Sequence, residues 1–185
     1  LDGLWPRLPI DRVFSVKGFG TVVTGTLQGG ELRAGMTLSA VPGGPKARVR
    51  GLQVHGVAVD RAARHARVAV NLQGVECEQL ARGMVLVPVD YEVVAASIEA
   101  VLEVWNEAST ALEDDLRVRV HHGTAEVMGR LRVGHEPLAP GQKRGVQIRL
   151  ESPLAALPGD RFVLRRYSPL ETLAGGTIVC LNSPR

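Results

Sequence analysis

The chain has 185 residues, 45% of them hydrophobic, and a formal net charge of +3, and it holds no run of about 18 apolar residues. These features exclude a disordered chain and a helical membrane span, and the length suits one large domain or two small ones. The first residues hold neither an initiator Met nor a signal-peptide pattern. We therefore expect a soluble, cytoplasmic fragment that begins within a longer protein.

The excess of positive charge lies in the first half of the chain. Residues 1–89 contain 11 Lys and Arg against 6 Asp and Glu, whereas residues 90–185 contain 11 against 13. Such an excess permits contact with a polyanion such as nucleic acid, but ordinary solvated surface charge explains it equally well.

Alternation of apolar and polar residues with period two dominates the first half, with many Val residues and a Gly or Pro about every ten residues. The segment Glu76–Arg82 favours a short helical turn that ends before Gly83. Six strands are predicted, the fourth of them bent near Gly51 or Gly56: Ile10–Val16, Thr21–Leu27, Met36–Val41, Ala47–Val59, Arg67–Leu72 and Met84–Pro88.

The second half repeats this pattern without repeating the sequence. Since closing a six-stranded sheet removes its exposed edges, we expect an all-β fold of two consecutive antiparallel β-barrels of about six strands each, in residues 1–89 and 90–185. An immunoglobulin-like sandwich is the alternative, weakened by the lack of a Cys-Trp-Cys pattern. The predicted strands are Ala96–Trp105, Leu116–His122, Ala125–Val133, Gly145–Ser152, Arg161–Tyr167 and Thr177–Leu181.

Residue patterns for metal binding or catalysis are weak. Cys77 and Cys180 are far apart, within apolar runs and without CxxC spacing, so we expect buried free thiols in a reducing cytosol. His121 and His122 near Glu126 are adjacent on a strand and point to opposite faces, so they cannot easily share a metal ion. No serine stands in a GxSxG elbow. We predict no catalytic residue and no metal site.

A glycine-rich stretch at residues 17–20, with Gly25 nearby, invites comparison with phosphate-binding loops. A P-loop needs GxxxxGK[ST] between a strand and a helix, and here another strand follows. The stretch therefore predicts a tight turn or bulge between strands, and this fragment is expected to hold no GTP by that route.

Arginines near strand ends allow two interpretations. Arg12, Arg64 and Arg67 in the first half, and paired arginines at residues 130 and 132 and at 165 and 166, can follow a phosphate backbone. On the residues alone, surface ion pairs, for instance between Asp11 and a neighbouring arginine, are favoured.

Residues 9–26, PIDRVFSVKGFGTVVTGT, resemble the opening of the second domain of translational GTPases of the elongation factor Tu type. The sequence of these residues is most similar to that of the selenocysteine-specific elongation factors. Residues 49–56, 67–76 and 82–86 support this resemblance in the first half, and residues 120–131, 159–169 and 172–176 resemble the third domain of the same factors. The resemblance implies a GTPase domain, with GTP and magnesium, before the chain and a domain that binds an RNA hairpin after it.

The resemblance also implies a pocket for the selenocysteinyl group lined by Asp11, Arg12 and Arg67. A selenol is more acidic than a thiol, whose ordinary pKa is about 8.5, so selenocysteine is largely an anion at neutral pH while serine is neutral. Each arginine contact to the anion is worth about 1.5 to 3 kcal/mol. Asp11 is expected either to orient an arginine or to accept a hydrogen bond from the aminoacyl amine.

One departure from the family pattern precedes Arg67, where Ala-Gly-Gln is replaced by Arg64, His65 and Ala66. His65 can still adopt a tight turn at some cost. This replacement leaves the placement of Arg67 open, and Arg64 or His65 could contribute charge to the pocket instead.

By the same resemblance, the second barrel lies against the acceptor and T stems of the tRNA. The implied function is a non-catalytic module that recognises selenocysteinyl-tRNA for delivery to the ribosome. Rival interpretations are the barrels of another translational GTPase with a different aminoacyl-tRNA, a small β-barrel enzyme, and a structural interaction barrel. Expected contacts with the tRNA backbone are Arg119, His121, His122, Arg130, Arg165 and Arg166.

Overall fold

A computed structural model describes residues 5–91 and 93–182, so the expected mid-protein start at Leu1–Leu4 lies outside the described residues. The chain divides into two compact units, Leu1–Glu92 and Val93–Arg185. Each unit is built around its own hydrophobic core. Within the described residues, no helix has the length and apolar character needed to cross a membrane.

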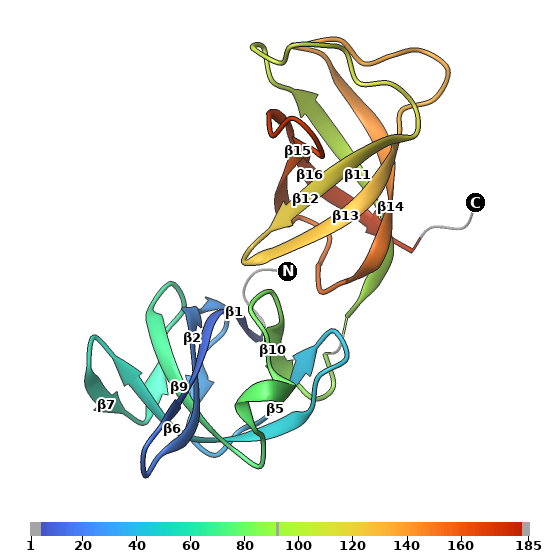
Figure 1. Cartoon of the computed structure of the whole chain (residues 1–185). Coiled ribbons are helices and arrows are strands. Elements are labelled where there is room, and N and C mark those ends of the chain that lie inside the picture. The colour runs from blue at the N-terminus through green and yellow to red at the C-terminus, as the bar shows by residue number, and fades with distance from the viewer. Residues whose placement is uncertain (1–4, 92, 183–185) are drawn as a thin grey trace. The chain divides into compact units, whose positions relative to one another are not determined.

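The first unit is a closed antiparallel barrel of six main strands (Figure 1). Its order around the ring is β1, β2, β9, β6, β5 and β10, and pairing of Leu8 with Leu86 joins β10 back to β1. Alternate residues of each strand point inward, as the period-two pattern predicts. These strands span Pro6–Val16 (β1), Gly20–Thr26 (β2), Thr37–Val41 (β5), Lys46–Val54 (β6), Arg67–Gln73 (β9) and Val85–Pro88 (β10).

The prediction of one bent strand over Ala47–Val59 is wrong. The chain reverses at His55 and Gly56, whose φ angles are 52° and 79°, and β7 (Val57–Val59) folds back on β6 as a hairpin. Two consecutive left-handed residues produce the turn that matches strand twist, and glycine adopts this conformation without strain. His55 and Gly56 therefore mark a turn between two strands and not a bend within one strand.

Short elements complete the first unit. β3 (Gln28–Gly29) pairs with the start of β1, and β4 (Leu32–Arg33) pairs with β8 (Arg61–Ala62). A 3₁₀ turn, η1, occupies Cys77–Gln79 within the segment predicted to form a helical turn. The Gln79 side chain accepts a hydrogen bond from the Glu76 amide at 2.9 Å and so caps this turn.

The second unit is a closed six-stranded antiparallel barrel (Figure 1). Its strands follow the order β11, β14, β13, β12, β15 and β16, and β16 pairs with β11 to close the ring. The prediction of two consecutive six-stranded barrels is thus confirmed, and the sandwich alternative is excluded. The strands span Ala95–Val104 (β11), Leu116–His122 (β12), Ala125–Arg132 (β13), Lys143–Leu154 (β14), Arg161–Arg166 (β15) and Thr172–Leu181 (β16).

The last strand begins five residues earlier than predicted, because Gly175 and Gly176 lie within it. A Cβ atom at Gly176 would stand 2.6 Å from Cζ of Phe162, so the glycine makes room for this buried ring. The glycines therefore serve core packing in the middle of a strand and do not precede it.

The prediction of buried thiols is wrong for both cysteines. Cys77 and Cys180 are free, but Cys77 is half-buried and Cys180 is exposed. Cys180 follows a bulge in β16, where the register against β11 shifts between Glu99 and Ala100. A bulge interrupts strict alternation, so the apolar run around Cys180 does not predict its side.

Candidate functional site

Asp11 stands at a bulge in β1. Ile10 pairs with Gly25 and Arg12 pairs with Thr24, so Asp11 is an extra residue on its strand. Gly25 permits a close backbone approach here, because a Cβ atom would stand 2.2 Å from the carbonyl oxygen of Pro9. A bulge redirects a side chain, and Asp11 reaches the outer face of the barrel, where it meets groups from β2 and β9.

Arg67 is the first residue of β9 and pairs with Thr26 of β2. The turn before it is closed by a hydrogen bond of 3.3 Å from the Ala66 amide to the Ala63 carbonyl. His65 has a φ angle of 68° in this turn, which is the left-handed region that favours glycine. His65 thus holds a conformation that favours glycine, and the strand still begins at Arg67.

Asp11 and Arg67, 56 residues apart in sequence, form a two-point ion pair. Asp11 Oδ2 accepts from Arg67 Nη1 at 2.5 Å, and Asp11 Oδ1 accepts from Nη2 at 3.2 Å. The hydroxyl of Thr24 donates to Asp11 Oδ1 at 2.6 Å. Because two parallel N–H···O bonds fix the plane of a guanidinium, Asp11 orients Arg67. Of the two expected roles of Asp11, this geometry supports the first.

Partial burial acts to raise the pKa of Asp11. Hydrogen bonds from Arg67 and Thr24, with the positive charges of Arg67 and Arg12, together act more strongly, so the pKa of Asp11 lies below its ordinary value. The bond to Asp11 likewise raises the pKa of Arg67. Asp11 is therefore ionised at neutral pH, and this carboxylate with the two guanidiniums of Arg67 and Arg12 carries one net positive charge.

Arg12 lies on the same outer face, because it pairs with Thr24, whose strand neighbour Val23 is in the core. Arg12 is exposed and, within the described part of the chain, forms no ion pair. The name aminoacyl cluster is used below for Asp11, Arg12, Thr24 and Arg67. Arg64 and His65 are also exposed beside Arg67, but no hydrogen bond or ion pair joins their side chains to described residues.

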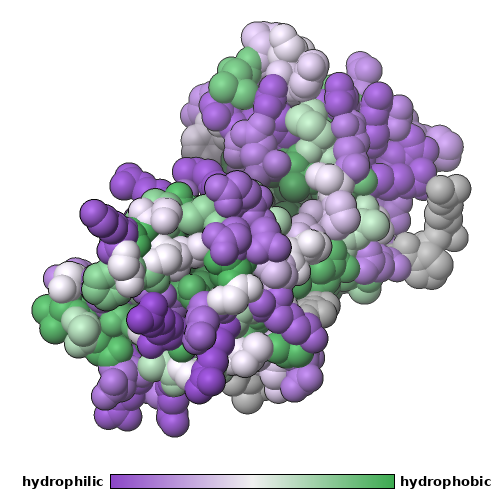
Figure 2. Space-filling view, turned by 60° about the horizontal axis from the view of Figure 1, so that its bottom comes forward, coloured by the Kyte–Doolittle hydropathy of each residue, from purple (hydrophilic) through white to green (hydrophobic). Residues whose placement is uncertain are grey.

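An apolar depression of about 340 Å³ lies on the same barrel, lined by residues of β1, β2 and β9 that neighbour the aminoacyl cluster along their strands. Thr24 pairs with Ala69, which lines this depression. Two exposed aromatic side chains, Phe14 and Phe19, stand at its wall. Hydrophobic residues reach the visible surface of the first barrel between hydrophilic ones (Figure 2). The positively charged aminoacyl cluster thus has an apolar depression near it.

In the second barrel, strand parity separates the predicted RNA contacts into two groups. Arg119 and His121 on β12, Arg130 on β13 and Arg165 on β15 alternate with buried neighbours and point outward. His122, at the end of β12, and Arg166, at the end of β15, occupy inward positions. Because β12 and β15 are antiparallel, the two residues lie at opposite ends of this strand pair. The sequence pairs 121–122 and 165–166 therefore each divide between surface and interior.

The inward members of these pairs hold the ends of the barrel together. His122 is 9% exposed, and its Nε2 lies 3.0 Å from Asp160 Oδ2. Arg166 Nε donates to Glu171 at 3.0 Å, and Arg166 Nη2 donates to Thr110 at 2.7 Å. These contacts occupy both side chains, which favours a structural role for His122 and Arg166 over contact with RNA.

His121 and His122 also have separate acidic neighbours. His121 Nδ1 lies 3.9 Å from Glu126, on the opposite side of the strand from the His122–Asp160 contact. Among the described residues, no group of three His, Cys, Asp or Glu side chains is arranged to hold a metal ion.

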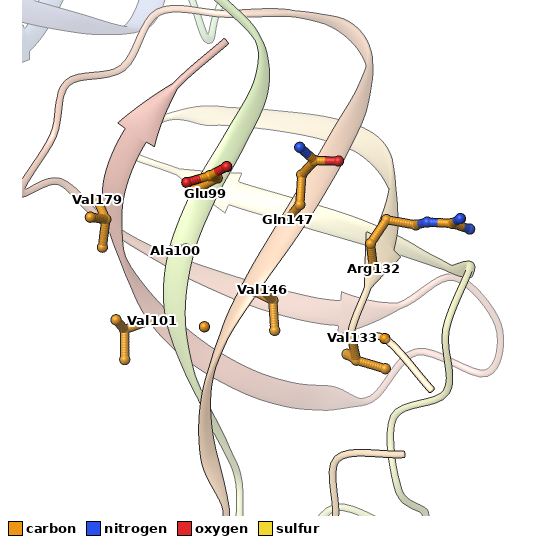
Figure 3. Close-up of a pocket in the computed structure, with 10 residues that line it drawn as sticks. Glu99, Ala100, Val101, Arg132, Val133, Val146, Gln147 and Val179 are labelled. Atoms are coloured by element: carbon orange, nitrogen blue, oxygen red, sulfur yellow. The ribbon is translucent and has the colours of Figure 1, made fainter. Parts of the chain in front are cut away.

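The outer face of β11, β13, β14 and β16 carries a further depression of about 470 Å³. Glu99, Gln147 and Arg132 form a cross-strand row beside it (Figure 3). Arg132 is held by Asp114 and Asp115, each at 3.1 Å. Glu99 is the acidic residue of the depression's lining, and the rest of the lining offers it no nucleophile or second acid, so the depression carries no catalytic arrangement.

Sequence reasoning missed several residues that belong to these surfaces. Thr24 could be recognised as part of the cluster only from the structure, because the bulge brings Asp11 within hydrogen-bond distance of its hydroxyl. Arg117 and Arg149 have the same strand parity as Arg119 and Arg130, so alternation alone could have identified them.

Comparison with known proteins gives matches in both barrels. Residues 99–185 match the beta-barrel domain of the selenocysteine-specific elongation factor, and residues 20–87 match domain 2 of elongation factor Tu. A selenocysteine-specific elongation factor from Desulfomicrobium baculatum is 41% identical over 94% of this chain, and one from Escherichia coli strain K12 is 35% identical over 97%. An elongation factor 1-alpha from Pyrobaculum arsenaticum is 40% identical over 45% of the chain and 19% of its own length.

The chain spans 27% of the length of the Desulfomicrobium relative and 28% of the Escherichia relative. The two family matches fall one in each barrel, in the order in which the resemblance of residues 9–26 and 159–169 places them. The matches and the near-complete coverage agree with the fold, and the chain therefore belongs to the selenocysteine-specific elongation factor family.

Proposed function

We propose that this chain is the tRNA-binding part of a selenocysteine-specific elongation factor, and that it recognises selenocysteinyl-tRNA for delivery to the ribosome. The observation that carries the proposal is the ion pair of Asp11 and Arg67 beside Arg12 on one outer face. These are the residues that the family resemblance implies for the selenocysteinyl group.

The charge of the aminoacyl cluster suits an anion. Two arginines and one carboxylate leave one positive charge, which a selenolate balances and a serine hydroxyl does not. Asp11 takes one N–H from each of Nη1 and Nη2 of Arg67, and the other three N–H groups of this guanidinium are left for a ligand. A fixed guanidinium loses less entropy on binding, so Asp11 contributes preorganisation.

The apolar depression beside the cluster suits the end of the tRNA itself. The amino acid is esterified to the terminal ribose, so the terminal base lies close to the aminoacyl group. Phe14 and Phe19 offer aromatic faces, on which a base can stack for about 1 to 3 kcal/mol. We assign this depression to the terminal nucleoside.

The second barrel contributes contacts to the RNA backbone through its outward side chains, Arg119, His121, Arg130 and Arg165. Double-stranded RNA is met mainly through phosphates and 2′-hydroxyls, and arginines on a sheet face suit this mode.

The chain is proposed to be a binding module and not a catalyst. GTP and magnesium are assigned to the GTPase domain of the full-length factor, which hydrolyses GTP, and this chain supplies no cofactor site. Its partners are then selenocysteinyl-tRNA, the ribosome, that GTPase domain and the domain that binds an RNA hairpin. We place the protein in the cytoplasm.

The proposal is tested by the factor with its GTPase domain and GTP, using selenocysteinyl-tRNA and seryl-tRNA on one tRNA body. Dissociation of the seryl form is expected to be faster by at least about tenfold, which corresponds to the lower limit of about 1.5 kcal/mol for one charged contact. Equal dissociation rates would replace the proposal with a general elongation factor for neutral aminoacyl groups.

A further inference from the structure

Arginines from four neighbouring strands gather on the outer face of the second barrel, where Figure 1 shows β12, β13 and β14 side by side. Arg117, Arg130 and Arg149 stand directly opposite one another on β12, β13 and β14. Arg119 of β12 stands opposite Arg165 of β15. We call these five residues the arginine face. Like charges in such positions repel one another, so this arrangement is unfavourable for the isolated sheet.

Three of the five arginines are held by carboxylates. Arg117 donates to both oxygens of Glu151 at 2.8 and 2.7 Å, and this contact lowers the pKa of Glu151. Arg119 is bonded to Glu126. Arg130 lies 3.4 Å from an oxygen of Asp115. These acids relieve the repulsion within the face, but they also place negative charge where a phosphate would approach.

The remaining members of the arginine face stay positive. Neither Arg149 nor Arg165 has a carboxylate partner among the described residues. The ring of Tyr167 lies 4.7 Å from the Arg117 guanidinium and 5.3 Å from that of Arg119, and this side chain is 48% exposed. The aromatic ring braces both guanidiniums without neutralising them. Five arginines against three carboxylates leave the face with a positive charge.

We propose that Glu126 and Glu151 lower the affinity of the arginine face for the backbone of an RNA helix, so that the face binds RNA weakly. The aminoacyl cluster then determines which tRNA is selected. The inference rests on the proposed function, since it supposes that RNA is the ligand. A face without these acids would retain RNA helices of any sequence and any aminoacyl group. With them, it adds affinity only to an RNA already held elsewhere.

The size of the effect follows from Coulomb's law. A unit charge about 7 Å from a phosphate in water changes affinity about two- to threefold, so removing two acids gives about four- to ninefold. Two freed arginines also neutralise more phosphates. The slope of log affinity against log salt concentration should therefore steepen by about one for each freed arginine.

The test measures binding of the whole chain to a short RNA hairpin with no aminoacyl group, at several salt concentrations. Glu126→Gln combined with Glu151→Gln is expected to bind about four- to ninefold more tightly than wild type, with a steeper salt slope. The matched control is Glu99→Gln with Glu103→Gln, which removes the same charge from β11. This strand lies three places from β12 and next to β14, and among the described residues neither acid forms an ion pair with an arginine of the face. This control should change affinity by less than about twofold.

Several results would overturn the inference. Weaker binding by the Glu126 and Glu151 variant would mean that these acids position the arginines for RNA. Equal gains in the test and control pairs would mean a general charge effect, and no binding by any variant at low salt would mean that the face does not meet RNA. Since the hairpin carries no amino acid, none of these results bears on the selenocysteine preference, which is measured separately.

Discussion

The two barrels present arginines in opposite ways. In the aminoacyl cluster, Arg67 is fixed by a two-point bond to Asp11, and residues 56 positions apart meet at one place. On the arginine face of the second barrel, five side chains spread over four strands. Arg117 also has a two-point bond, to Glu151, but two of the five have no carboxylate partner among the described residues.

This difference separates two kinds of recognition. A small anion such as a selenolate is distinguished by one oriented guanidinium, because the contact depends on geometry. An RNA backbone repeats its charge along its length, so scattered arginines can meet it without a fixed register. We therefore propose that the same residue type serves selection in the first barrel and general affinity in the second.

The largest effect on this comparison is expected at Gly25, which allows the bulge of Asp11. The change Gly25→Ala places Cβ against the Pro9 carbonyl oxygen, so it should lower the free energy of unfolding of the first barrel by about 3 kcal/mol. Urea unfolding measures this. Gly51→Ala is the control, since its Cβ would meet nothing within 4 Å. Equal stability of both variants would show that the bulge does not depend on this close approach.

A smaller effect should separate the two neighbouring arginines of β15. Arg166→Ala leaves Glu171 without its ion pair at the barrel end, and we expect a loss of about 2 kcal/mol in the stability of the second barrel. Arg165→Ala should cost less than about 1 kcal/mol but weaken hairpin binding. Chemical unfolding and RNA titration of both variants check the division. Weaker RNA binding only in the Arg166 variant would contradict the assignment of sides.

The ion pair of Asp11 should make stability depend on pH. Because the pKa of Asp11 is lowered on folding, its stabilising effect is present above the unfolded value of about 3.8 and is lost as the pH falls through the lower folded value. Asp11→Asn should cost up to about 1 kcal/mol at pH 7, since Arg67 is half exposed. The difference from wild type should shrink in acid. A constant difference between pH 7 and pH 2 would contradict this.

The smallest effect is expected at His65, which holds a left-handed conformation at the turn before Arg67. His65→Gly should relieve backbone strain and raise the free energy of unfolding by about 0.5 kcal/mol. Ala66→Gly, at the next position, should lower it by a similar amount. Thermal unfolding of the two variants gives the comparison, and destabilisation by both would show that the imidazole itself stabilises the turn.

Alternation of residues was sufficient to predict the fold class and most strands, because each strand has one face in a core. Alternation failed as a predictor where a turn or a bulge interrupts a strand. A turn at His55 and Gly56 divided one predicted strand into two, and a bulge near Cys180 moved its thiol to the surface. Such local irregularities depend on pairing partners that are distant in sequence, so a single strand does not reveal them.

The candidate site was partly predictable for the same reason. The family resemblance supplied Asp11, Arg12 and Arg67 but left open whether Asp11 orients an arginine or accepts from an amine, and the observed bond supports the first role. Parity could have assigned His122 to the interior in advance. Its partner Asp160 is 38 residues away and reaches it only because β12 pairs with β15, whereas Glu171, the partner of Arg166, follows it in the turn between β15 and β16.

The central claim is that an oriented Arg67 distinguishes selenocysteine from serine. The most direct measurement compares dissociation of selenocysteinyl-tRNA and seryl-tRNA from the GTP-bound factor for wild type, Arg67→Ala and the control Arg61→Ala on β8. We predict that Arg67→Ala reduces the selenocysteine preference by about 10- to 100-fold, corresponding to about 1.5 to 3 kcal/mol, while Arg61→Ala preserves it. An undiminished preference in Arg67→Ala would contradict the account.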